Sequence, residues 1–162
     1  MKPAKIVSGE DWLAERKALL EREKAFTRAR DEVSAARRDL PWVRVEKDYV
    51  FATADGPNPL ADLFDGRDQL MVYHFMLGPD WKQGCKACSY LADHFDPAVI
   101  HLAHRDVSFV SVSRAPLDQI EPFKKRMGWT FPWVSSFDTD FNRDFHVSFE
   151  QAEMDAGETY YN

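Results

Sequence analysis

Long apolar runs and a surplus of positive charge are both missing from this sequence. No uninterrupted apolar stretch approaches the roughly 20 residues that cross a bilayer. The N-terminal segment has no apolar core of the signal-peptide type. The formal net charge is −6 and the sequence pI is about 5.3. These absences argue against a membrane protein and against a general affinity for nucleic-acid phosphates. We therefore expect a protein of the reducing cytoplasm.

Cysteine is also scarce, because only Cys85 and Cys88 occur among the 162 residues. In a reducing compartment, a close cysteine pair is more typical of a catalytic or metal-binding site than of a structural disulfide. Three interpretations compete: a redox pair, half of a metal site, or two incidental small buried residues. The pattern around the pair has to decide among them.

The first forty residues differ in pattern from the rest of the chain. Ser8 and Asp11 form a helix-capping arrangement. Apolar residues then recur every seven positions as far as Pro41, at Trp12, Leu19, Phe26, Val33 and Leu40. We expect residues 1–40 to form an amphipathic helical arm. The arm packs either on its own domain or on a partner, for example in a homodimer.

Residues 41–162 carry an alternation of strand and helix patterns. Alternating apolar residues over 43–51 predict a half-buried strand, and the run "ADGPNP" at 54–59 predicts a turn. Residues 69–77 read as a central strand covered on both faces. Further strands are expected within 106–113 and 131–137. Helices are expected at 85–95, 99–102, 117–127 and 140–147.

Two residues mark the limits of the helix expected at 117–127. Gly128 is a natural stop, and Pro122 marks a kink or a late start. The order strand, helix, strand, helix, strand predicts a parallel α/β fold. A chain that is 44% hydrophobic is long enough to bury the core of such a fold.

The cysteine pair lies between a predicted strand and a predicted helix, which places Cys85 at the first helical turn. Backbone N–H groups and the helix dipole stabilise a thiolate there, and Lys86 adds a neighbouring cation. Cys88 lies one turn further on the same face but deeper, where its thiol stays protonated. Disulfide exchange needs this combination of an exposed attacking sulfur and a buried resolving sulfur.

The metal interpretation depends on Cys85, Cys88, His101 and His104, whose spacing is close to that of a zinc finger. Zinc fingers usually leave about three to five residues between the histidines, and this chain leaves two. The flanking strands also supply a core without zinc. The redox pair is therefore preferred, with no metal and no organic cofactor.

The residues above resemble a bacterial family of thioredoxin-like proteins of unknown function, described as predicted dithiol–disulfide oxidoreductases. This family lies near the peroxiredoxin branch of the thioredoxin superfamily. The resemblance covers most of the chain through collinear segments, among them "RRDLPWVRVEKDYVF", "LADLFDGRDQLMVYHFMLGPDW", "GCKACSYLADHFD" and "KKRMGWTFPWVSSFDTDFNRDFHVSF".

The resemblance implies an α/β, thioredoxin-like fold over residues 41–162, with residues 1–40 as an N-terminal helical extension. Cys85 corresponds to the exposed nucleophile and Cys88 to its resolving partner. Family members usually continue beyond "YYN" into a strand hairpin, whereas this chain stops at Asn162. We therefore expect the C-terminal hairpin to be absent and the sheet edge to be finished otherwise, for example by a second subunit.

Other side chains are candidates for supporting roles. Trp81 and Trp129 either pack in the core or form an apolar wall at the mouth of the site, suited to a peptide or a partner protein. Arg126 either faces water or holds a thiolate or a peroxide-derived oxygen, as arginine does in peroxiredoxins. His74 lies in a predicted strand and reads as a core histidine with satisfied hydrogen bonds.

The sequence thus predicts a thiol–disulfide oxidoreductase that works through a mixed disulfide and then a Cys85–Cys88 disulfide. Its substrate would be a disulfide-containing protein or a small thiol compound, and another dithiol would donate the electrons. Two alternatives stay open. One is a dithiol-dependent peroxidase, in which Cys85 becomes a sulfenic acid and Cys88 condenses with it. The other is a non-catalytic binding module built on the thioredoxin fold.

Overall fold

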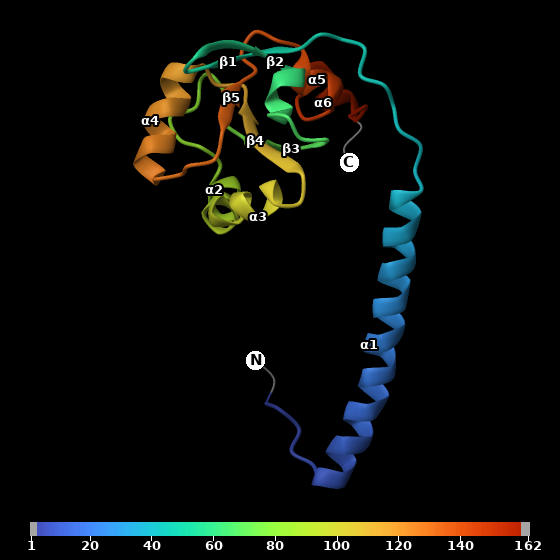
Figure 1. Cartoon of the computed structure of the whole chain (residues 1–162). Helices are drawn as coiled ribbons and strands as arrows, with labels where there is room; N and C mark the ends of the chain where they lie inside the picture. The colour runs from blue at the N-terminus through green and yellow to red at the C-terminus, as the bar shows by residue number, and fades with distance from the viewer. Residues whose placement is uncertain (1–2, 160–162) are drawn as a thin grey trace. The chain divides into compact units, whose positions relative to one another are not determined.

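The computed structural model of the chain describes residues 3–159 (Figure 1). The chain divides into two compact units, with the boundary between Glu46 and Lys47. Between residues 3 and 159, no helix combines the length and the apolarity that crossing a membrane requires.

The first unit contains one long helix, α1 (Gly9–Arg38). The predicted cap is confirmed, because the Ser8 hydroxyl oxygen accepts the Asp11 backbone N–H at 3.1 Å. Within residues 3–46 no second helix or strand is present to cover the apolar stripe of α1. Packing of that stripe on the body of the protein or on a partner therefore stays a prediction.

The second unit is built on a sheet whose strand order is β2-β1-β5-β4-β3 over the described residues (Figure 1). The strands are β1 (Val50–Thr53), β2 (Gly56–Pro59), β3 (Gln69–His74), β4 (Val107–Ser113) and β5 (Trp133–Ser135). β3, β4 and β5 run parallel, and β1 joins β5 in the antiparallel direction. The predicted α/β order is confirmed.

Helices connect the parallel strands. α2 (Lys86–Phe95), η2 (Asp96–Ala98) and α3 (Val99–Ala103) lead from β3 to β4, and α4 (Leu117–Met127) leads from β4 to β5. Gly128 ends α4 with a φ of 75°, as expected. The helix continues through Pro122 from its start at Leu117, so the predicted late start is wrong. The remaining elements are η1 (Leu60–Phe64), α5 (Phe141–Asp144) and α6 (Gln151–Ala156).

Three strand predictions need correction. The strand expected over 43–51 begins only at Val50, because pairing with β2 starts there. The expected turn at 54–59 is mostly strand β2, which tolerates Pro57 and Pro59 because it lies at the sheet edge, where a missing N–H costs little. β3 is the opposite edge strand rather than a central one, and β4 is the strand buried along almost its whole length.

Each face of the sheet carries its own core. One core joins the sheet to α2 and α4, and it contains Phe75, Phe109, Phe131, Trp133, Ala92, Ile120 and Phe123. The other joins the sheet to η1 and α5, and it contains Phe51, Val110, Val112, Val134 and Phe141. Neighbouring β4 residues serve different cores because successive side chains of a strand point to opposite faces.

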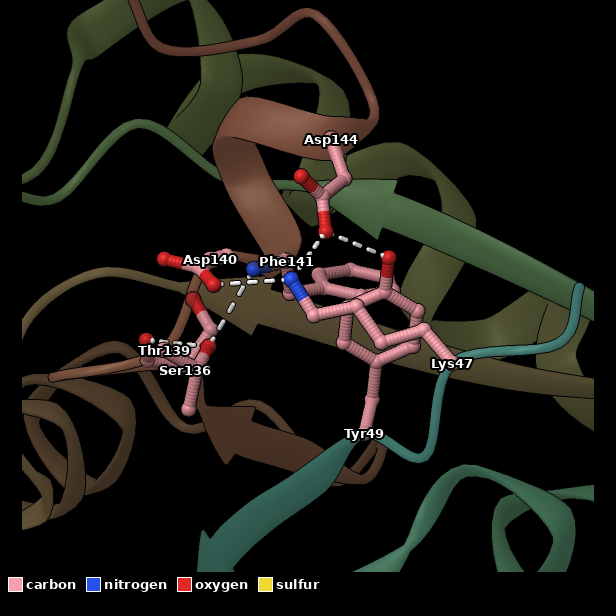
Figure 2. Close-up of polar contacts among 7 residues, drawn as sticks. All are labelled: Lys47, Tyr49, Ser136, Thr139, Asp140, Phe141 and Asp144. Atoms are coloured by element: carbon pink, nitrogen blue, oxygen red, sulfur yellow. Dashed lines mark hydrogen bonds and ion pairs between the residues drawn. The ribbon is translucent and has the colours of Figure 1, made fainter.

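A charged cluster fastens the segment before β1 to α5 (Figure 2). The Lys47 ammonium lies 2.7 Å from one carboxylate oxygen of Asp140 and 2.7 Å from one of Asp144. The Tyr49 hydroxyl donates to the same Asp144 oxygen at 2.6 Å. After α5 the described chain adds only α6, and no C-terminal strand hairpin occurs up to residue 159.

Candidate functional site

The two cysteines lie where the chain leaves β3 and enters α2. Cys85 is the N-cap residue of α2, immediately before its first residue Lys86. The Cys85 backbone N–H donates to the Met76 carbonyl at 2.9 Å, and the Ser89 N–H donates to the Cys85 carbonyl at 2.9 Å. These bonds fix the backbone of Cys85 to the end of β3 on one side and to α2 on the other.

The Cys85 side chain is partly exposed, and its surroundings favour the thiolate. The pKa of Cys85 is lowered mainly by a hydrogen bond from the Cys88 backbone N–H. The Cys88 thiol and the Ala87 N–H lower it further, against an opposing effect of burial. N–H groups of a first helical turn have no partner within the helix, so a thiolate can accept them. A larger share of Cys85 is therefore thiolate at a given pH than in an ordinary cysteine.

Cys88 has the opposite environment. It is 9% exposed and belongs to the core under α2. Burial is the main cause that raises the pKa of Cys88, because the charged form of a thiol is poorly solvated there. Both thiols are free, and each contributes to the pKa shift of the other. A thiol with a lowered pKa and a thiol with a raised pKa thus lie one helical turn apart.

Gly84, next to Cys85, is a positioning residue that the sequence analysis missed. A Cβ atom at Gly84 would lie 2.6 Å from Cε1 of Phe75 and 2.9 Å from Cζ of Phe123. Both rings are buried, so neither can turn away easily. Only glycine lets the loop pack this tightly, and this packing sets the position of Cys85. Nothing in the local sequence signals the contact, because Phe123 lies 39 positions away in the chain.

Tyr73 of β3 is a second residue that the sequence analysis missed. Its hydroxyl donates to the Cys88 carbonyl at 3.3 Å, and Tyr73 partly offsets the rise in the pKa of Cys88. The ring packs edge-on against Phe95, with 4.8 Å between centroids. Burial, followed by the contact with Cys88, raises the pKa of Tyr73, so its hydroxyl keeps its proton. Tyr73 can therefore turn its hydroxyl hydrogen from the Cys88 carbonyl to the Cys88 sulfur when that sulfur is charged.

The residues predicted to support the cysteine pair differ in their exposure and in what they contact. Lys86 is exposed at the start of α2, and the lowered pKa of Cys85 comes from hydrogen bonds to Cys88 and Ala87 instead. Trp81 is 45% exposed, and it lines cavities on both of its sides. The indole therefore forms part of the surface of the loop that leads to Cys85.

Trp129 and Arg126 make their side-chain hydrogen bonds to groups other than the thiols. Trp129 is 6% exposed in the core, and its indole N–H donates to Asp93 at 2.8 Å, so it is not a wall at the mouth of the site. Arg126 donates to the Gln83 side chain at 2.6 Å, and its guanidinium lies 4.7 Å from the Phe123 ring centroid. Arg126 thus braces the cysteine loop and does not hold the thiolate.

The zinc interpretation finds no support in the arrangement of the ligand types. No three or more His, Cys, Asp or Glu side chains among residues 3–159 come together in a group that could hold a metal. His101 and His104 are exposed at the end of α3, whereas Cys88 is buried. The prediction that His74 is a satisfied core histidine is wrong, because its Nδ1 is buried without a hydrogen-bond partner.

Solved structures of low sequence identity share the architecture of the second unit. A cysteine-to-serine mutant of PrxQ from Xylella fastidiosa matches with a TM-score of 0.51 and 17% identity, over 71% of this chain and 73% of that one. At this identity the match shows the fold alone. The chain therefore has the thioredoxin-like α/β fold that was predicted, with an N-terminal helix.

Two Bacteroides structures match less well. A candidate protein disulfide isomerase from Bacteroides thetaiotaomicron has a TM-score of 0.45 and 21% identity, over 62% of this chain and 63% of that one. This chain thus spans less than two thirds of that protein. A candidate thiol–disulfide oxidoreductase from Bacteroides vulgatus has a TM-score of 0.48 and 15% identity, over 64% and 70% of the two chains.

Sequence comparison places the chain in a family. No curated protein matches it significantly. The sequence model of one family, described as "Bacterial protein of unknown function (DUF899)", matches residues 1–162. The protein therefore belongs to this bacterial family of unknown function.

Proposed function

We propose that this protein is a thiol–disulfide oxidoreductase in which Cys85 is the nucleophile and Cys88 is the resolving thiol. The observation that carries the proposal is the asymmetry of the pair. Cys85 is partly exposed at the N-cap of α2 and has a lowered pKa, whereas Cys88 is buried one turn further on and has a raised pKa. If the two cysteines were only incidental core residues, nothing would explain why their exposure and pKa differ in this way.

The reaction follows from the two environments. The Cys85 thiolate attacks one sulfur of a substrate disulfide, so a mixed disulfide forms and the other substrate sulfur leaves as a thiolate. Cys88 then attacks the Cys85 sulfur, loses its proton, and releases the second substrate thiolate. Two electrons have passed to the substrate, and a Cys85–Cys88 disulfide remains. An external dithiol reduces that disulfide, and no metal or organic cofactor takes part.

Tyr73 and Trp81 have roles in this scheme. The Tyr73 hydroxyl stabilises the developing charge on Cys88 when that thiol loses its proton. The exposed face of Trp81 offers apolar contact to a disulfide-containing protein or a small disulfide compound. An enzyme reduced by a dithiol donor works best in a reducing compartment such as the cytoplasm.

A dithiol-dependent peroxidase is the second candidate function, and one observation supports it. The low pKa of Cys85 suits attack on a peroxide as well as on a disulfide. The contacts of Arg126 favour disulfide exchange, because the groups that bind this guanidinium are Gln83 and Phe123 and not a thiol. A peroxidase needs a group that polarises the peroxide oxygen.

The deciding experiment measures the rate of Cys85 alkylation against pH and then the reduction of disulfides and peroxides. We expect an alkylation midpoint below the ordinary thiol value of about 8.5, and dithiol-driven reduction of a small disulfide that Cys85→Ser abolishes. Faster turnover of hydrogen peroxide than of any disulfide would favour the peroxidase. An alkylation midpoint at the ordinary thiol value, together with no turnover of disulfides or peroxides, would favour a non-catalytic binding module.

A further inference from the structure

A cavity of about 350 Å³ lies beside the end of β3, within the size range of small-molecule sites. One side is formed by residues 74–78 and by Trp81. The other side is formed by residues 147–149 and by Met154 of α6. Neither cysteine lines this cavity, so it is separate from the thiol site. It adjoins that site through Met76, whose carbonyl accepts the Cys85 N–H, and through Trp81 of the loop that leads to Cys85.

The walls are mainly apolar, and one positive charge lies among them. Arg114, immediately after β4, lines the cavity and is exposed. Its polar contact is a long one, 3.5 Å from a guanidinium nitrogen to the Ser148 hydroxyl. No carboxylate of residues 3–159 pairs with it, whereas Arg67 and Arg143 of the same unit both pair with carboxylates. No acidic side chain lines the cavity.

His74 adds a neutral polar group to the same wall. Its ring is stacked on Phe141, with 5.5 Å between centroids and an interplanar angle of 22°. Nδ1 is buried without a partner, and Nε2 also makes no hydrogen bond with the described residues. Burial lowers the pKa of His74, so the ring is uncharged at neutral pH. The cavity therefore carries one net positive charge, on Arg114.

We propose that this cavity binds a small apolar monocarboxylate, with Arg114 holding the carboxylate and the apolar body against Met76, Trp81 and Phe149. A guanidinium matches a carboxylate in two parallel hydrogen bonds. A neutral apolar ligand would leave Arg114 without a counterion, and an anion of two or more charges would exceed the single charge available. The inference goes beyond thiol exchange, since Trp81 is the only residue of the cavity to which that reaction gives a role.

Calorimetric titration of the full chain with octanoate, and separately with octanol, tests the charge preference. We expect saturable binding of one octanoate per chain and weaker binding of octanol. Arg114→Gln should weaken octanoate binding about tenfold or more, as the loss of hydrogen bonds to a charged group does, and should leave octanol binding unchanged. The matched control is Arg105→Gln, which removes the same charge from an exposed residue that lines no part of the cavity.

A second variant tests the location. Met154→Trp adds bulk to the cavity wall and should weaken both ligands, and circular dichroism verifies that it folds. Equal weakening by Arg114→Gln and Arg105→Gln would overturn the proposal, and so would octanoate binding that either cavity variant leaves unchanged. Absence of saturable binding to the folded wild-type chain would overturn it too. Cys85→Ser should bind octanoate normally, so the result is independent of the redox proposal.

Discussion

The cluster around Lys47 and the pair of cysteines contribute to different faces of the sheet. They differ in how the charges of their titratable groups are balanced. In the cluster around Lys47, groups of opposite charge satisfy one another. Hydrogen bonds to Asp140 and then Asp144 raise the pKa of Lys47, and those from Lys47 and Tyr49 lower the pKa of Asp144 (Figure 2). Every charge has a partner, so the cluster fastens the fold and leaves no reactive group.

The thiol pair works with two identical groups instead. Cys85 and Cys88 start from the same reference pKa, and helix-end N–H groups lower one while burial raises the other. The result is one thiol with a lowered pKa and one with a raised pKa beside it. We expect reactivity where neighbouring groups have unequal environments, and a structural role where opposite charges satisfy one another.

The largest effect is expected from Cys88→Ser, which removes the buried half of the asymmetry. The first attack by Cys85 should persist, but the mixed disulfide can no longer be resolved. Steady-state turnover should fall by about a hundredfold or more, and a protein–substrate adduct should accumulate in mass spectra. Rapid turnover by this variant, without an adduct, would show that Cys88 does not resolve the intermediate.

Gly84→Ala should have the next largest effect, because the added methyl meets buried rings. Overpacking of this kind costs about 1–3 kcal/mol of unfolding free energy, measurable by denaturant titration. Displacement of the loop should also raise the pKa of Cys85 toward its ordinary value, seen in the pH dependence of alkylation. Gly9→Ala is the matched control, because nothing lies within 4 Å of its Cβ position. Equal effects of the two variants would contradict the positioning role.

Tyr73→Phe should have a smaller and more selective effect. It removes the hydroxyl at Cys88 and keeps the ring against Phe95. Loss of a hydrogen bond to a developing charge should slow the resolving step about tenfold and leave the first attack unchanged, in single-turnover measurements. Tyr90→Phe, on the exposed side of α2, is the control. Equal slowing of both steps by Tyr73→Phe would indicate a general structural defect.

The smallest effect is expected from Lys47→Met, which breaks the satisfied cluster. The folded-state pKa of Asp144 is lowered, so its stabilising contribution is present above its unfolded value of about 3.9 and is lost as the pH falls further. Unfolding free energy in the variant should therefore depend less on pH in acid. Cys85 alkylation should not change, and a changed alkylation midpoint would show that the two clusters are coupled.

The sequence analysis succeeded where the signal is local. The cap at Ser8, the stop at Gly128 and the place of Cys85 at the start of a helix each depend on a few neighbouring residues. The parallel order of strands and helices follows from periodicity and turn residues in the same way. β2 was predicted wrongly, as a turn. Its two prolines indicate a turn in the sequence, and only the tertiary structure shows that β2 is an edge strand, where prolines are tolerated.

The sequence alone therefore determined the periodicity of the elements, the helix ends and the three-residue spacing of the thiols. Each of these depends only on residues within one or two turns of backbone. Contacts between distant segments were not. The fit of Gly84 against Phe123, the Tyr73 hydroxyl on Cys88, and the cavity between residues 74–81 and 147–154 exist only after folding. Packing brings these side chains together across the sheet, and no local pattern encodes which of them will meet.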